Sequence, residues 1–344
     1  MKKILVTGPD GFVGVAVCRE LLRRKYCVRG AQWCDIPVPA GCESVAVGDI
    51  GAETDWSDAL SEVDAVVHLA ARVHIMQDRV DDPLKEYRKV NVRGTQSFAE
   101  EAAKAGVKRF VLLSSVKVNG EFTEQGISKS ANHLSNGLTG KDAISPQKVF
   151  KETDQACPED PYAISKWEAE QVLWKIETRT GMDVTILRSP LIYGPGIKAN
   201  FLKLIQLIDR GIPLPFGGIH NKRSLMGLTN LVDLICCSLK HPAAANNTFL
   251  VSDGDDVSTP ELVQRIAQAL GKNPRLLPIP EWVMKLGGRL TGKSAQVQRL
   301  CSSLLIDSSK VRRILNWTPS CTMDEELTQV AKWYRNNSFG FSNK

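Results

Sequence analysis

The sequence predicts an α/β protein in which a doubly wound parallel sheet is joined to a smaller, mixed α/β C-terminal domain. Up to about residue 190, short runs rich in β-branched residues alternate with helical patterns. The runs are almost continuously apolar, as expected for parallel strands that helices cover on both faces. Beyond residue 195 the helical segments lengthen, and Pro and Gly become more frequent. We therefore expect one domain over residues 1–190 and a second over residues 191–337.

The elements of the first domain follow one another in a regular order. Strands are expected at "KILVTG", "YCVRGAQ", "ESVAVGDI", "DAVVHLAA", "RFVLLSS" and "DVTILRSP", because each run is short, apolar and bounded by polar residues or glycine. Longer patterns at residues 12–24, 83–106 and 162–181 predict the helices between them. Residues 121–155 form a polar stretch with little periodicity, typical of a functional loop or a disordered connection. In the second domain a few short strands are expected, "NTFLVSD" among them.

Composition and charge exclude several classes of protein. The net charge is +6 over 344 residues, and no basic stripe favours a nucleic-acid partner. Nine cysteines without a CxxC pair suit free thiols in a reducing compartment, so we expect a cytoplasmic protein with no metal site. The N-terminal apolar run is interrupted too early for a signal peptide, and no run is long enough for a membrane span.

A glycine-rich turn follows the first strand and opens the first helix. "VTGPDGFVG" places Gly8, Gly11 and Gly14 where a tight turn and a close backbone approach are needed. The N-terminus of a helix offers unpaired N–H groups and partial positive charge to a pyrophosphate. Strand, glycines and helix therefore predict a dinucleotide site with GxxGxxG spacing; the alternative is a glycine-rich turn without a ligand.

The end of the second strand leaves the cofactor open between NAD and NADP. An acidic residue normally holds the adenosine ribose of NAD there, but the strand ends in Gln32 and Trp33, with Asp35 beyond it. Arg29, or the cluster at residues 23–25, could instead meet the 2′-phosphate of NADP. Basic residues after a helix are also often merely solvated.

"DPYAISK" predicts a helix start that carries a tyrosine and a lysine on one face. Asp160 is a good N-cap and Pro161 suits the first helical position, so Tyr162 and Lys166 lie one turn apart. A nearby ammonium favours a phenolate, which could accept a proton while an alcohol is oxidised. "FVLLSS" supplies Ser114 or Ser115 at the end of a buried strand, where ligands bind in such sheets. Taken alone, the pair favours the solvated start of a surface helix; its place after GxxGxxG and a serine-ended strand favours the acid/base centre instead.

Together these motifs resemble an extended short-chain dehydrogenase/reductase of the nucleotide-sugar epimerase and dehydratase type. The resemblance runs from Lys2 to about Trp333. "VTGPDGFVG" matches the family's TGxxGxxG, "SSVKVNG" its SSxxVYG, "PYAISK" its YxxxK, and "LRSPLIYGPG" its RxxNxYGPG. The family pattern implies a Rossmann-like first domain and a second domain that mainly binds the nucleotide sugar. It assigns contacts with NAD or NADP to Gly8, Asp10, Gly11, Phe12, Val13, Gly14, Asp49, Ile50, Leu69, Ala70, Ala71, Asn91, Tyr162, Lys166 and Pro190.

The same resemblance implies the roles of a catalytic trio. Tyr162 would be the proton acceptor, Lys166 would bind the nicotinamide ribose and lower the pKa of Tyr162, and Ser115 would hold the sugar hydroxyl. Contacts with a UDP-sugar substrate are assigned to Ser115, Lys117, Asn200 and Arg223. For Arg223 the alternative is a surface arginine paired with Asp233.

Four departures from the family pattern bear on the substrate. Leu191 stands where the family has an asparagine that contacts the sugar nucleotide, and Asn119 replaces the tyrosine of VYG. Val116 and Lys117 stand where dehydratases have Asp-Glu, so no acid and base are evident for the loss of water. Ser115 and Tyr162 are also farther apart than usual, and the surplus falls in residues 121–155. This insertion is expected to form a lid beside the sugar site, or else an unstructured surface loop.

The leading expectation is 4-epimerisation of a UDP-hexose or UDP-N-acetylhexosamine with NAD or NADP. The alternative is an NAD(P)H-dependent reductase of a UDP-4-keto-6-deoxy sugar, which "SSVKVNG" and the missing asparagine at Leu191 favour. A more distant alternative is a non-catalytic NAD(P)-binding sensor. The resemblance also implies a homodimer built on the helices at residues 83–104 and 161–179.

Overall fold

A computed structural model describes residues 2–34, 36–73, 81–123 and 148–341, without the side chains of residues 338–341. Its main sheet has seven parallel strands in the order β3-β2-β1-β4-β5-β6-β9. The order reverses at β1, which creates the crevice in which doubly wound sheets bind ligands. The strands are β1 (Lys3–Thr7), β2 (Cys27–Gln32), β3 (Glu43–Ala46), β4 (Ala65–His68), β5 (Arg109–Ser115), β6 (Asp183–Ser189) and β9 (Asn247–Leu250).

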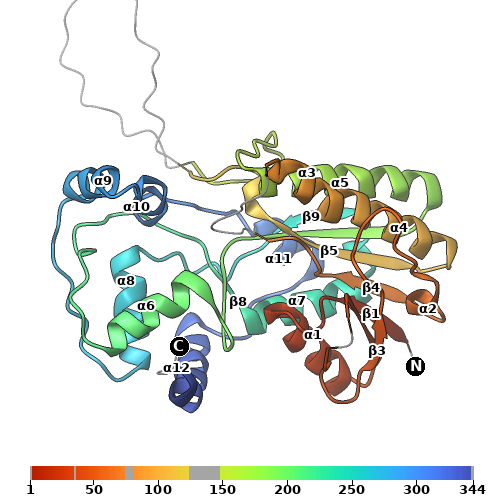
Figure 1. Cartoon of the computed structure of the whole chain (residues 1–344), viewed down its shortest axis with the longest axis horizontal. Helices are drawn as coiled ribbons and strands as arrows, with labels where there is room; N and C mark the ends of the chain where they lie inside the picture. The colour runs from red at the N-terminus through yellow and green to blue at the C-terminus, as the bar shows by residue number, and fades with distance from the viewer. Residues whose placement is uncertain (1, 35, 74–80, 124–147, 342–344) are drawn as a thin grey trace, which may run out of the picture.

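Helices cover both faces of this sheet because its strands are apolar on both sides (Figure 1). In β1, Ile4 and Val6 join one buried cluster, while Leu5 between them joins the other. The first cluster is covered by α1 (Phe12–Arg23), α7 (Leu228–Lys240) and α11 (Ser309–Leu315). The second is covered by α2 (Ser57–Leu60), α4 (Thr95–Lys104) and α5 (Pro161–Thr180).

The expected domain boundary at residue 190 does not separate the sheet from the rest of the chain. Strand β9 pairs with β6, so the seventh strand comes from the segment assigned to the second domain. Helices α7 and α11 also pack on the sheet rather than in the C-terminal lobe. Without them, β6 would be an open edge and one face of the sheet would be partly uncovered. Residues 191–337 therefore contribute to both lobes.

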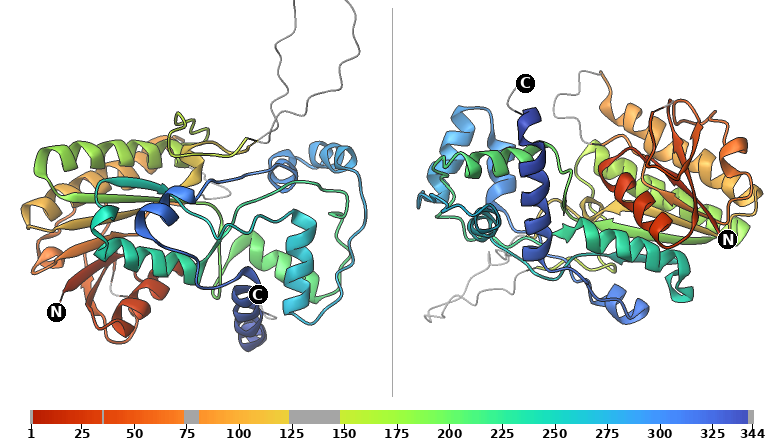
Figure 2. Two further views of the ribbon diagram at one scale, coloured as in Figure 1. Left: turned by 180° about the vertical axis from the view of Figure 1, so that it is seen from behind. Right: turned by 90° about the horizontal axis from the view of Figure 1, so that it is seen from below.

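The C-terminal lobe lies beside the carboxyl ends of the strands (Figures 1 and 2). Its core is formed by α6 (Ala199–Asp209), α8 (Thr259–Ala269) and α12 (Met323–Phe341). The short strands β7 (Ile192–Tyr193) and β8 (Met226–Gly227) pair where the chain passes between the lobes. Helices α9 (Glu281–Leu290) and α10 (Ser294–Cys301) form a hairpin at the outer end of this lobe. The 3-10 turn η3 (Pro242–Ala244) precedes β9.

Local capping explains where the helix with the tyrosine and lysine begins and ends. The Asp160 carboxylate accepts the N–H of Ala163 at 2.7 Å, and Pro161 occupies the first turn, as expected. Gly181 ends the helix with a φ of 71°. The long helix expected at residues 83–106 is instead divided into α3 (Pro83–Tyr87), a π-helix η1 (Arg88–Gly94) and α4.

Membrane-spanning helices and metal sites were searched for among the described residues. Among those residues no helix is both long and apolar enough to cross a membrane. Likewise, no group of three or more His, Cys, Asp or Glu side chains is placed there to hold a metal ion.

Candidate active site

The turn between β1 and α1 leaves no room for side chains at its glycines. Gly8 has a φ of 66°, and a Cβ on Gly14 would lie 1.9 Å from the carbonyl oxygen of Gly8. Gly11 caps α1 without a side chain, so the first N–H groups of the helix face the carboxyl edge of the sheet. Asp10 beside them is exposed, and Phe12 and Val13 are half-buried. This cradle fits a dinucleotide pyrophosphate.

The ends of β1 and β4 are joined by one threonine. Thr7 Oγ1 accepts the N–H groups of Leu69 and Ala70, both at 3.1 Å, and pairs with His68 Nδ1 at 2.8 Å. These bonds hold Leu69, Ala70 and Ala71 along the glycine turn, where a Cβ on Gly8 would lie 3.3 Å from Ala70. Burial and the charge of Lys166 lower the pKa of His68 to about 3, so this imidazole is neutral and structural.

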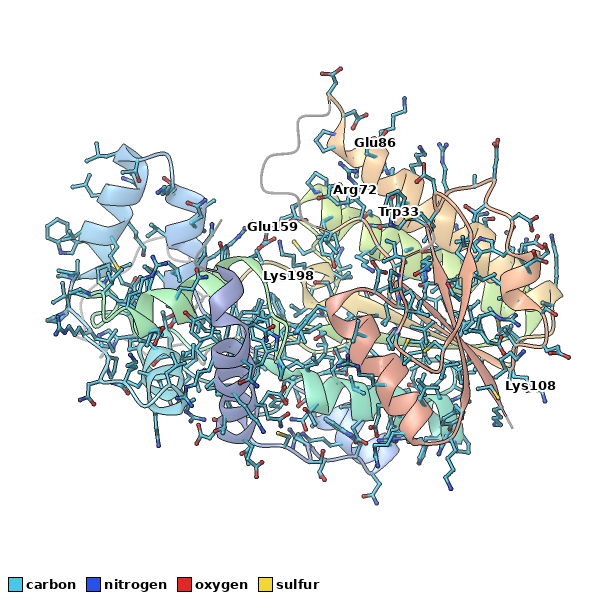
Figure 3. The ribbon with its side chains drawn as sticks, turned by 60° about the horizontal axis from the view of Figure 1, so that its bottom comes forward. Trp33, Arg72, Glu86, Lys108, Glu159 and Lys198 are labelled. Carbon is cyan, nitrogen blue, oxygen red and sulfur yellow. The ribbon has the colours of Figure 1, made fainter. Side chains whose placement is uncertain are left out.

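The end of β2 offers an uncharged acceptor where an acidic residue was sought. Gln32 is buried, and its Oε1 has no hydrogen-bond partner in the described structure, while Nε2 donates to Ile36 O and Ser44 Oγ. Trp33 follows it and is 60% exposed. Figure 3 shows Trp33 and Arg72 at one edge of the sheet and Lys108 at the other. Asp35 lies outside the described residues.

The basic residues expected to meet a 2′-phosphate are engaged elsewhere. Arg29 lies within β2, pairs with Glu43 and donates to three backbone carbonyls. Arg23 and Arg24, at the far end of α1, pair with Glu20, and Arg24 also pairs with Asp233. Of the alternatives left open at the end of β2, contact of these arginines with a 2′-phosphate is therefore disfavoured, because their charges are compensated away from the cofactor edge.

Asn91 connects the cofactor edge to the helix of the tyrosine. It lies in the π-helix η1, a distortion that is often found at functional sites. Its Oδ1 accepts the N–H of Arg72 at 2.8 Å, and its Nδ2 donates to Arg72 O and to Ser165 Oγ. Ser165 Oγ in turn donates to Tyr162 O at 2.8 Å. The nearby Ile50 packs on Gly94, whereas Asp49 is exposed.

Ser115, Tyr162 and Lys166 meet at the carboxyl end of β5. Ser115 is the last residue of the strand, and its hydroxyl lies close enough to Tyr162, in the first turn of α5, to lower the pKa of that phenol. One turn later Lys166 is 4% exposed, and its Nζ donates to Leu113 O at 2.9 Å. Ser115 and not Ser114 is therefore the serine beside the tyrosine.

The two titratable groups of this trio are shifted by burial. Burial and the negative charge of Asp160 raise the pKa of Tyr162, while the hydrogen bond from Ser115 opposes them. Burial lowers the pKa of Lys166 to about 8, although the charge of Glu170 opposes that shift. The expected lowering of the tyrosine pKa by the lysine is thus absent in this structure. Lys166 Nζ is directed to a backbone carbonyl, and burial dominates at the phenol.

Ser114 belongs to a buried polar network behind the trio, which the sequence motifs did not reveal. It donates to Glu170 Oε1 at 2.5 Å, and Arg188 holds the same carboxylate with Nη2 2.6 Å from Oε2. Arg188 Nη1 donates to Asn119 Oδ1 at 2.9 Å, and Asn119 Nδ2 donates to Lys151 O. A serine, an asparagine, a glutamate and an arginine at these spacings give no such signal without the fold.

Lys117 lies at the opening of the site between two carboxylates. Its Nζ is 2.5 Å from Glu121 Oε1 and 2.6 Å from Asp160 Oδ2. Burial would raise the pKa of Asp160, but its hydrogen bonds with Lys117 and Ala163 outweigh burial and lower it. Lys117 thus compensates the negative charge that stands beside Tyr162.

The other expected substrate residues lie on the C-terminal side of the opening. Arg223 Nη1 donates to Arg299 O and Ser302 O, and burial lowers its pKa, so it does not pair with Asp233. Asn200 is exposed at the start of α6. Pro190 is buried after β6, and Leu191 beside it is 51% exposed.

The insertion can be followed only at its two ends. Residues 124–147 lie outside the described residues, so the expected lid is untested there. Thr123 and Phe150 bind the same segment, through Thr123 N to Ser303 O and Phe150 N to Leu305 O. Phe150 is 1% exposed. The ends of the insertion are therefore attached to the chain that connects the two lobes.

Comparison with known proteins agrees with this fold and site. Residues 4–252 match the model of the NAD dependent epimerase/dehydratase family. The chain is 44% identical over 333 residues to a UDP-glucose 4-epimerase of Vibrio cholerae, covering 96% of this chain and 95% of the relative. It is 29% identical to an N-acetyl-alpha-D-glucosaminyl-diphospho-ditrans,octacis-undecaprenol 4-epimerase of Escherichia coli O157:H7, covering 78% of this chain and 77% of the relative.

A solved structure shows the same fold along the whole chain. MoeE5 in complex with UDP-glucuronic acid and NAD superposes with a TM-score of 0.73, at 23% identity, over 97% of this chain and 99% of its own. The resemblance seen in the motifs is therefore confirmed. With its Rossmann-like sheet, its glycine turn and the family match over most of its length, the chain belongs to the NAD dependent epimerase/dehydratase family, among the extended short-chain dehydrogenases/reductases.

Proposed function

We propose that the protein is an NAD-dependent UDP-sugar 4-epimerase that acts on a UDP-hexose or UDP-N-acetylhexosamine. The observation that carries the proposal is the meeting of Ser115, Tyr162 and Lys166 at the carboxyl end of β5, in a chain 44% identical to a UDP-glucose 4-epimerase. NAD is preferred to NADP because no free arginine stands at the end of β2 among the residues described there. An uncharged Gln32 acceptor does not repel a ribose hydroxyl.

Each of the three residues Ser115, Tyr162 and Lys166 has one task in this reaction. Ser115 holds the C4 hydroxyl of the sugar, and Tyr162 takes its proton and later returns it. Lys166 releases Leu113 O to bind a ribose hydroxyl, which brings its ammonium toward the phenol and lowers the pKa of Tyr162. Bound NAD supplies the acceptor and donor of hydride. Because hydride and proton both return, the 4-keto sugar formed between must present its opposite face before reduction.

Binding of the nucleotide part is assigned to the C-terminal side of the opening. Arg223 has donors beyond those used on Arg299 O and Ser302 O, and a guanidinium suits a diphosphate. Asn200 and Lys117 complete the proposed substrate contacts. We also infer a cytoplasmic homodimer that uses α3, η1, α4 and α5, whose outer sides face away from the sheet (Figure 1).

One observation favours a second candidate function, the NAD(P)H-dependent reduction of a UDP-4-keto-6-deoxy sugar. Leu191 replaces a polar side chain at the site and is 51% exposed beside β6. An apolar group there matches the methyl of a 6-deoxy sugar better than a hydroxymethyl group. Tyr162 would then donate its proton rather than accept one.

The test separates the two functions by their cofactor balance. We expect the purified protein to interconvert UDP-glucose and UDP-galactose, or their N-acetylated forms, without net consumption of NAD. Oxidation of NADH or NADPH in step with loss of a UDP-4-keto-6-deoxy sugar, without epimerisation, would instead establish the reductase.

Tyr162→Phe tests the assigned proton transfer. We expect kcat to fall by about 10²–10⁴, the usual contribution of a positioned acid or base, with little change in KM. Tyr26→Phe, away from the site, is the control. If Tyr162→Phe retained full turnover, the catalytic assignment would fail and the NAD-binding sensor would be favoured.

A further inference from the structure

Helix α9 presents its apolar face away from the protein. Trp282, Leu286 and Leu290 recur every four residues and are 68%, 49% and 81% exposed, and Val283 beside them is 36% exposed. At 3.6 residues per turn these four side chains lie within an arc of about 100°. Gly288, roughly opposite that arc, is the buried residue of the helix and packs against Val297 of α10.

This exposed arc needs an explanation because it is contiguous. Single exposed apolar residues are normal on protein surfaces, but a tryptophan and two leucines aligned on one helix mark an interaction site. The apolar arc does not complete the core of the C-terminal lobe, which is built from α6, α8 and α12. Trp282, Leu286 and Leu290 are not among the described buried and half-buried residues that form this core.

The charge around the arc indicates what it contacts. Residues 281–301 hold four basic side chains, Lys285, Arg289, Lys293 and Arg299, against Glu281 alone, so this hairpin carries +3 of the chain's net +6. Lys285 and Arg289 border the apolar arc on one side, because each directly precedes a leucine of the arc in sequence and so lies about 100° behind it around the helix. Trp and Leu on one face with Lys and Arg on its border are typical of helices that lie on an anionic bilayer.

The position of the hairpin permits such contact. Helices α9 and α10 form the outer end of the C-terminal lobe in Figure 1 and again in the reverse view of Figure 2. The helix pair meets the rest of the lobe through the end of α10, where Arg299 O and Ser302 O accept hydrogen bonds from Arg223. A flat surface can therefore reach α9 without displacing the sheet lobe.

We propose that α9 is a peripheral membrane-binding helix, in which Trp282, Leu286 and Leu290 enter the interface of an anionic bilayer and Lys285, Arg289 and Lys293 contact lipid phosphates. The inference goes beyond the reaction proposed above and does not depend on it. Because α10 holds Arg223, binding would place the substrate side of the protein next to the membrane surface.

Vesicle co-sedimentation of the full chain tests this proposal. We expect binding to phosphatidylglycerol vesicles at low salt, weak binding to phosphatidylcholine vesicles, and loss of binding at high salt. Leu286→Glu, and separately Lys285→Glu with Arg289→Glu, should each lower the partition coefficient roughly tenfold or more. The matched controls are Ile212→Ser, an exposed apolar residue elsewhere, and Lys332→Glu on α12, and both should bind like the wild type.

Tryptophan emission provides a second readout on the same vesicles. The difference between the wild type and Trp282→Phe should show a blue shift with phosphatidylglycerol, because the indole of Trp282 leaves water. Equal binding to both lipids, undiminished binding of Leu286→Glu, or no blue shift would overturn the proposal. So would light scattering that shows wild-type self-association abolished by Leu286→Glu, since a second copy of the chain would then be the partner of α9.

Discussion

At the scale of single residues, Lys166 lowers the stability of the fold but has a role in the proposed reaction. Its ammonium is buried beside Tyr162 and holds one backbone carbonyl, so folding must remove most of its hydration. Burial lowers its pKa from 10.5 to about 8. A lysine whose pKa is lowered on folding opposes folding at every pH at which it binds a proton more tightly in the unfolded chain than in the folded one. The lysine is therefore kept for the proposed reaction rather than for stability.

Lys166→Met should stabilise the protein near neutral pH. The shift of the pKa from 10.5 to about 8 corresponds to roughly 3 kcal/mol, offset in part by the lost hydrogen bond to Leu113, so we expect a gain of about 2 kcal/mol at pH 7. The penalty is complete below the folded pKa and disappears as the pH rises toward the unfolded one. The gain should thus shrink between about pH 8 and pH 10.5.

Urea unfolding at several pH values measures this change. Lys175→Met, on an exposed position of the same helix, is the control and should show no comparable pH-dependent gain. A destabilised Lys166→Met at pH 7 would contradict the burial cost assigned to the ammonium.

At the scale of elements, close approach of backbone segments shapes the glycine turn. Helix α1 can start directly behind β1 because Gly14 lacks a side chain. We expect Gly14→Ala to cost about 3 kcal/mol or more and to abolish NAD binding, because its Cβ would lie 1.9 Å from Gly8 O. Gly51→Ala is the matched control, since a Cβ there meets nothing within 4 Å. Calorimetric titration with NAD together with urea unfolding measures both effects, and normal NAD binding by Gly14→Ala would refute the tight turn.

The packing of α5 on β5 and β6 depends on a buried ion pair. Arg188 and Glu170 are 9% and 0% exposed, and Ser114 and Asn119 complete their hydrogen bonds. Removing one charge leaves the other buried and uncompensated. We expect Glu170→Gln to cost about 3–5 kcal/mol and the double variant Glu170→Met with Arg188→Met to recover much of that loss.

A second ion pair of α5, at the surface, provides the control. Glu100 pairs with the largely exposed Arg179 between α4 and α5, and Glu100→Gln should cost at most about 1 kcal/mol in urea unfolding. Equal costs for Glu170→Gln and Glu100→Gln would mean that burial of the Arg188 pair contributes nothing.

At the scale of the whole molecule, a pair of buried acids lies between the two lobes. Glu326 of α12 accepts the N–H of Thr229 at 3.3 Å, and its Oε1 has no partner in the described structure. Asp253 accepts from Tyr193, Gly227 and Asn230. Burial raises the pKa of both acids, and the negative charge of Asp253 adds to the effect of burial on Glu326. Their ionisation therefore opposes the docking of the lobes.

This pair makes stability depend on pH in a defined direction. An acid whose pKa is raised on folding binds its proton more tightly in the folded protein, so stability falls as the pH rises from the unfolded pKa through the folded one. Glu326→Gln should raise the urea midpoint above neutral pH and have a smaller effect near pH 4.5, the ordinary pKa of the group. Glu53→Gln, on an exposed loop, is the control. A loss of stability above neutral pH would contradict the assignment.

The alternation of apolar runs and helices predicted the parallel sheet, and the order of glycine turn, serine and YxxxK predicted that Ser115, Tyr162 and Lys166 lie together. Both signals are local, because a strand's burial and a turn's backbone geometry select residue types within a few positions. The domain boundary could not be found in this way, since β9 joins the sheet through pairing with β6, a contact between segments far apart in sequence.

Tertiary structure alone decided how the charges are used. Arg29, Arg24 and Lys117 looked available in the sequence, but partners from other elements compensate them. Burial sets the direction of the pKa shifts at Tyr162 and Lys166. The type of a residue does not reveal whether the fold will bury it. Local motifs therefore predicted which residue types meet at the site. The charges and pKa values of these residues depend on the tertiary structure, because it decides which distant groups come together and which are removed from water.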